Sequence, residues 1–81
     1  MPVPKFRWSR ISPGAFAATS GDLKLVVKSV ALPMSPELFE WTLLNRRTGL
    51  PINARNGMKS TFDQAVAAAE QSAQGYLASG Y

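Results

Sequence analysis

The sequence contains no cysteine and no histidine. Without cysteine the chain can form neither a disulfide bond nor a thiolate metal site, and without histidine it lacks the commonest general base and metal ligand. We therefore expect no metal site and no triad-type catalysis. A chain without cysteine also suits a reducing compartment, and we expect a cytoplasmic protein.

Long apolar runs and phosphate-binding loops are also missing. The start Met-Pro-Val-Pro-Lys lacks the apolar run of a signal peptide, so we expect none. No apolar stretch approaches the length of a membrane span. Its six glycines are scattered and match neither common nucleotide-binding spacing. We expect a soluble protein with no membrane partner and no cofactor.

The composition that remains is that of a folded protein. Of the 81 residues, 46% are hydrophobic and 10% aromatic, which predicts a single domain, 1–81, with one modest core. Nine Lys and Arg against five Asp and Glu give a net charge of +4. This balance favours an anionic partner such as nucleic acid or an acidic protein surface. The alternative is that the charge serves only solubility.

Period-two alternation of apolar and polar residues predicts strands over the first two thirds of the chain. Glycine, proline and polar clusters separate the apolar segments and predict turns. The predicted strands are 5–10, 15–18, 23–32, 38–44 and 50–55, the last ending before Asn56 and Gly57. Phe6, Trp8, Phe39 and Trp41 are expected to face the core.

The last third of the chain has the spacing of an amphipathic helix that Ser60 or Thr61 can cap. Gly75 is expected to mark where the helix weakens. The predicted inward positions are Phe62, Ala65, Val66, Ala69, Ala73 and Leu77. Together the elements predict an α+β fold, an antiparallel sheet of three to five strands with one C-terminal helix packed on one face.

The acidic residues do not suggest an enzyme. Asp22, Glu37, Glu40, Asp63 and Glu70 are expected in a turn, on surfaces and at a helix cap, and no two form a recognised catalytic pair. We therefore expect a non-catalytic binding protein.

Basic residues define the candidate binding site. If the aromatic residues face the helix, alternation sends Arg7, Lys24, Lys28 and Arg46 to the opposite face of the sheet. Apolar residues among them, such as Val26 and Leu44, favour a recognition surface over a merely solvated one, although a solvated polar face is the alternative. A second cluster consists of the turn 45–49, including Arg47, with Arg55 and Lys59, where cations on loops could hold phosphates.

The run Lys59-Ser60-Thr61-Phe62-Asp63-Gln64-Ala65-Val66 and the alanine-rich helix after three strands resemble the AP2-like domains of plant factors and of the arm-binding ends of phage integrases. The resemblance covers about the last half of the chain. In that family the exposed face of the sheet reads DNA. The resemblance therefore implicates Arg7, Lys24, Lys28 and Arg46 in DNA binding.

The chain also resembles, in size and type, the small orphan proteins of bacteriophages and prophages, which include anti-CRISPR proteins. That resemblance implies a stoichiometric role inside a bacterial host cell. Two hypotheses follow. In the first, the basic sheet face docks on nucleic acid or on a nucleic-acid-bound protein complex. In the second, the loops around Met34, Arg47 and Met58 bind and inhibit a host protein complex. A homodimer held by sheet edges is a third possibility.

Overall fold

The computed structural model describes residues 6–31, 33–34 and 36–79, with only the backbone described at 53, 54 and 79. It contains strands β1 (Ser9–Ser12), β2 (Ala15–Ser20), β3 (Leu23–Val30), β4 (Leu38–Asn45) and β5 (Pro51–Lys59), followed by helix α1 (Phe62–Ser79). Lys5, the first residue of the first predicted strand, lies outside the described residues.

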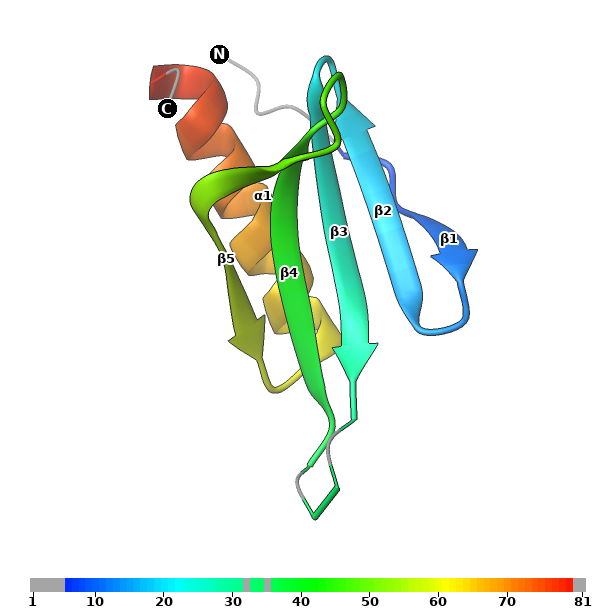
Figure 1. Cartoon of the computed structure of the whole chain (residues 1–81). Coiled ribbons are helices and arrows are strands. Elements are labelled where there is room, and N and C mark those ends of the chain that lie inside the picture. The colour runs from blue at the N-terminus through cyan, green and yellow to red at the C-terminus, as the bar shows by residue number, and fades with distance from the viewer. Residues whose placement is uncertain (1–5, 32, 35, 80–81) are drawn as a thin grey trace.

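The five strands form one antiparallel sheet in the order β1-β2-β3-β4-β5, so each strand pairs with its neighbour in the sequence. Helix α1 packs across one face, against β3, β4 and β5, and lies behind these strands in Figure 1. The predicted α+β fold, an antiparallel sheet with a C-terminal helix on one face, is confirmed. We call the face opposite α1 the open face.

The core lies between the middle of the sheet and the helix. Leu25, Val27 and Leu43 are fully buried on the helix side of β3 and β4. The alanines Ala65, Ala69 and Ala73, also at 0% exposure, form the inner stripe of α1, and their small side chains let the helix approach the sheet closely. Larger, partly buried side chains surround this centre, namely Phe6, Trp8, Phe39, Trp41, Ile52, Phe62, Val66 and Tyr76.

The segment before β1 fills the helix side of the sheet next to α1. Trp8 donates a hydrogen bond from Nε1 to Oε2 of Glu70, over 2.8 Å, and so joins this segment to the helix. Phe6 also packs against the core. The inward direction predicted for both aromatic residues is confirmed, but the strand itself begins only at Ser9, later than predicted.

The structure refines the sequence interpretation of α1 and β5 at Leu77, at Gly75 and at the end of β5. Leu77 was predicted to face inward, but it is 45% exposed and Tyr76 packs on the core instead. Successive four-residue steps drift by about 40° around a helix, so after Ala73 the core-facing position is three residues on. The helix continues through Gly75, where it was expected to weaken, and runs to Ser79. Strand β5 continues to Lys59 through the Asn56–Gly57 pair that was predicted to end it.

The helix begins where the sequence predicts. Thr61 Oγ1 accepts a hydrogen bond from the backbone N–H of Gln64 at 3.1 Å, which is the geometry of an N-cap. Ser60 Oγ bonds the Gln64 side chain at 3.0 Å and holds the same turn. These contacts hold the short connection between β5 and α1. The strand and the helix lie side by side (Figure 1).

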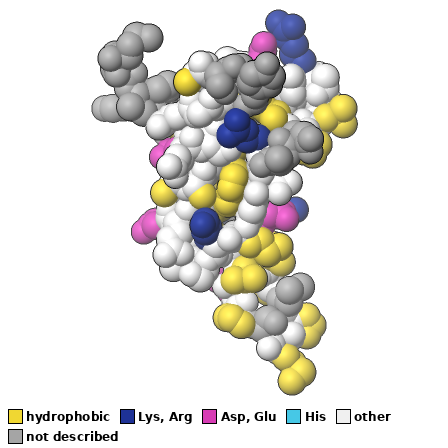
Figure 2. Space-filling view, turned by 90° about the vertical axis from the view of Figure 1, so that its left-hand side faces the viewer, with side chains coloured by type: hydrophobic (Ala, Val, Ile, Leu, Met, Phe, Trp, Pro, Cys, Tyr) yellow, Lys and Arg dark blue, Asp and Glu magenta, His cyan; other side chains and the backbone are white. Residues whose placement is uncertain are grey.

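The hairpin between β3 and β4 projects beyond the rest of the sheet (Figure 1). Met34 lies in its turn with a φ of 62° and a fully exposed side chain. Hydrophobic side chains gather on this projecting end in Figure 2.

Candidate functional site

The open face carries two lysines in line along β3. Lys24 and Lys28 have the same parity as Val26, opposite in direction to the buried Leu25 and Val27. The two lysines are four positions apart along the strand, so their Cα atoms are about 13 Å apart. This separation lets the two lysines contact two separate anionic groups of a polymer rather than one small anion.

The row of basic residues continues at one end of the sheet. The backbone N–H of Arg46 donates to the carbonyl of Asp22 at 2.7 Å, which extends the pairing of β3 and β4 into the turns. The Arg46 guanidinium donates to the carbonyl of Gly21 at 3.0 Å, and the Nε of Arg47 lies 3.4 Å from Oδ1 of Asp22. Lys24, Lys28 and Arg46 thus share one face, with Arg47 beside them.

An acidic residue interrupts this row. Glu40 pairs with Lys28 across β3 and β4, and its Oε1 lies 3.2 Å from Nζ of Lys28. The carboxylate therefore offsets the charge of one of the two lysines. Lys24, whose cross-strand partner is Leu44, forms no ion pair within the described residues.

Apolar side chains lie among these charges. Val26 stands between the two lysines, and Leu44 is the cross-strand neighbour of Lys24. Both are only partly buried, as is Leu38, while Met58 on β5 is 48% exposed. The open face therefore combines cations with accessible hydrophobic surface, as the sequence predicts.

Two of the predicted site residues lie elsewhere. Arg7 is exposed in the segment before β1 and is not part of the sheet. Arg55 lies on the helix side of β5, where its Nη1 is 3.4 Å from the carbonyl and 3.3 Å from Oγ of Ser72. Its guanidinium carbon also lies 6.0 Å from the centre of the Tyr76 ring. The structure therefore gives Arg55 a role in holding β5 to α1.

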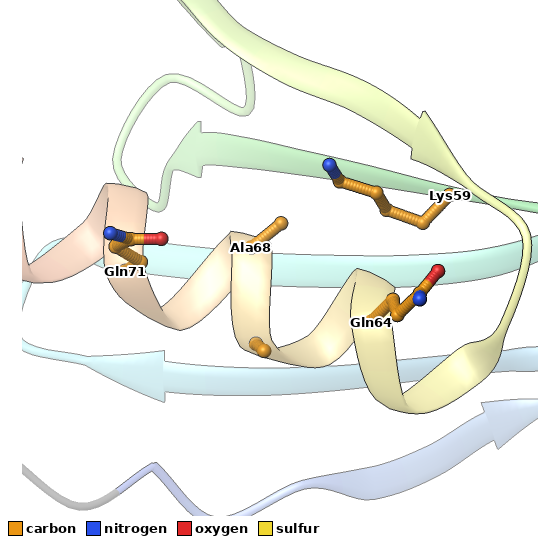
Figure 3. A pocket seen from close by; sticks show the side chains of 5 residues that line it. Lys59, Gln64, Ala68 and Gln71 are labelled. Atoms are coloured by element: carbon orange, nitrogen blue, oxygen red, sulfur yellow. The ribbon is translucent and has the colours of Figure 1, made fainter.

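A groove runs between β5 and α1 on the helix side. One part of it has a volume of about 370 Å³ and is lined by Trp41, Arg55, Lys59, Ala68, Gln71 and Ser72. Next to it lies a second hollow that shares Lys59, Ala68 and Gln71 and adds Gln64 and Ala67. We call the two together the β5–α1 groove. Figure 3 shows Lys59 extending from the end of β5 across this groove, with Gln64 and Gln71 on the helix beside it.

Trp41 lines this groove, and the hydrogen bonding of its indole N–H is unusual. Its Nε1 is buried and has no hydrogen-bond partner among the described residues, whereas Nε1 of Trp8 is bonded to Glu70. A buried N–H without an acceptor costs roughly 1–3 kcal/mol, so such groups are uncommon. The nitrogen lies over Gly57, which leaves room for the indole ring.

No protein-family model, curated protein or solved structure matches the chain.

The described residues contain neither a metal-ligating cluster nor a membrane-spanning helix. In the described part of the chain, no group of three or more acidic side chains is placed to hold a metal ion. No described helix is both long and apolar enough to cross a membrane. The surfaces with distinctive chemistry are the basic and apolar open face and the donor-rich β5–α1 groove.

Sequence reasoning placed Lys59 in a loop cluster with Arg47, but it did not find the groove. The signal was present in the alternation along β5, because Arg55, Gly57 and Lys59 all have the same parity. They face α1, since Gly57 pairs with Trp41 and Lys59 with Phe39. Extending the predicted strand through Gly57 would have placed both cations beside the helix.

Proposed function

We propose that the protein is a non-catalytic binding protein that docks the open face of its sheet on nucleic acid. The observation that carries this proposal is the row of Lys24, Lys28 and Arg46 on a face that no other element of the described chain covers. Basic side chains in line can contact successive phosphates, and these contacts supply most of the affinity of non-specific binding.

The apolar residues of the same face support this assignment. Val26 and Leu44 lie between and beside the lysines, where they can contact sugars and bases once the phosphates hold the strand. Such a surface binds through many weak contacts and needs no catalytic group. This fits a chain whose carboxylates are dispersed over turns, sheet and helix.

The test is binding of fluorescently labelled duplex and single-stranded DNA, followed by anisotropy at about 50 and 200 mM salt. We expect affinity to fall steeply with salt. Lys24→Gln and Arg46→Gln should each weaken binding and lower the salt slope by about one. Lys59→Gln, on the helix side, is the matched control and should leave binding unchanged. Salt-insensitive binding, or no binding at the lower salt, would overturn the proposal.

The projecting β3–β4 hairpin favours a second candidate, an inhibitor that inserts this hairpin into a host protein complex. The exposed Met34 at its turn has the flexible, polarizable side chain suited to adaptable protein interfaces. Met58, grouped with the loops in the sequence interpretation, instead lies in β5 on the open face. In this case Met34→Ser should abolish capture of the protein partner while Lys24→Gln has no effect.

A further inference from the structure

We propose that the β5–α1 groove binds a small oxyanion of the phosphate class. This site is separate from the open face and does not depend on the proposed function, because the sheet lies between the two surfaces. Four observations support the inference: the free charge of Lys59, the character of the groove lining, the unpaired Trp41 N–H and the room that Gly57 leaves.

Lys59 supplies the positive charge. It forms no ion pair with any described residue, although its ammonium group lies over the groove. Its position is set by the register of β5, where Lys59 pairs with Phe39 and so faces the helix. Lys59 is exposed at the end of β5, an edge strand, so its ammonium group is accessible to a ligand in the groove.

The groove lining consists of donors and small side chains. Gln71 offers an amide and Ser72 a hydroxyl, and the guanidinium of Arg55 lies at the same wall. No carboxylate lines either hollow among the described residues, since Glu70 points to the other side of α1, toward Trp8. Ala67 and Ala68 leave the space open. An oxyanion is the ligand that accepts from all of these groups at once.

Trp41, which lines the same groove, adds a neutral donor. Its Nε1–H is buried without an acceptor in the described part of the chain, and an indole N–H can only donate. A phosphate oxygen entering beside Lys59 provides the acceptor that the described residues do not supply. Gly57 matters here because any side chain at that position would press on this nitrogen.

The experiment uses the two tryptophan indole N–H signals of the ¹⁵N-labelled protein in a titration with inorganic phosphate at constant ionic strength. Trp8→Phe assigns the two signals by removing one of them. We expect the Trp41 signal to shift with saturation, while the Trp8 signal, already bonded to Glu70, stays in place. Chloride at the same ionic strength should move neither signal.

Variants on the two faces decide the location. Lys59→Gln should weaken phosphate binding at least about tenfold, because it removes a charge-assisted hydrogen bond. Lys24→Gln is the control on the open face and should leave the titration unchanged. Equal shifts of both indole signals, no saturation, or an unchanged titration of Lys59→Gln would each overturn the site. None of these outcomes bears on DNA binding by the open face.

Discussion

Nε1 of Trp41 lies so close over Gly57 that a Cβ built at position 57 would stand 2.9 Å from it. Two further atoms of the indole, Cε2 and Cζ2, would both lie at 3.2 Å. The close approach of the indole explains why a glycine occupies the middle of β5 at a position with no positive φ. The glycine is needed for space and not for a turn.

Gly57→Ala should therefore destabilise the protein by about 1–3 kcal/mol, because the added methyl group forces the Trp41 ring to move within a packed layer. Urea denaturation followed by circular dichroism measures the change. Gly75→Ala is the control. There the new Cβ would lie 3.7 Å from Nη1 of Arg55, an ordinary contact, so the gain in helix propensity should stabilise by about 0.5–1 kcal/mol. Equal effects of the two variants would contradict this interpretation.

Thr61→Ala should cost about 1 kcal/mol of stability, because it removes the oxygen that accepts from the Gln64 N–H at the start of α1. The same denaturation measurement tests it. Thr61→Ser keeps the accepting oxygen and should remain close to the parent protein. A loss as large in Thr61→Ser as in Thr61→Ala would show that the methyl group and not the cap matters.

Arg55→Met should lower stability by about 1–3 kcal/mol, since it removes the hydrogen bonds that join β5 to Ser72 of α1. If the open face binds nucleic acid, this variant should retain the DNA affinity of the parent protein, measured under conditions where both are folded. A selective loss of DNA binding without loss of stability would restore the phosphate-holding role that the sequence suggested for Arg55.

Glu40→Gln should strengthen DNA binding, because it releases Lys28 from its carboxylate partner and removes a negative charge from the open face. Stability should change by less than about 1 kcal/mol, since the Lys28 side chain is 56% exposed and surface ion pairs contribute little. Anisotropy titrations at low salt provide the comparison. Unchanged affinity in this variant would argue against phosphate contacts near Lys28.

Much of the architecture could be predicted from the sequence. The alternation in β3 and β4 and the helical spacing of alanines in α1 reflect burial directly, so they indicated the faces correctly. Element ends were less predictable. Gly57 looked like a turn residue because its requirement for space comes from Trp41, on the neighbouring strand.

The candidate site was predictable only in part. Lys24, Lys28 and Arg46 share a face because strand parity determines it, and parity can be counted along the sequence. The contact between Arg55 and Ser72 depends on how β5 lies against α1, which no local pattern encodes. The groove beneath Lys59 has the same origin, because two elements must pack before it exists.

The order of the sheet has a consequence for how the chain folds. Every strand after the first pairs with the strand just before it, so each new strand can pair with one that is already part of the sheet. Contacts between residues distant in the sequence are needed mainly when α1 packs over the core. Chains dominated by such local pairing cross a low entropic barrier and fold faster than sheets built from distant segments. During synthesis on the ribosome, the sheet can assemble strand by strand as it emerges, with its apolar side bare until the helix, which is made after all five strands, covers it.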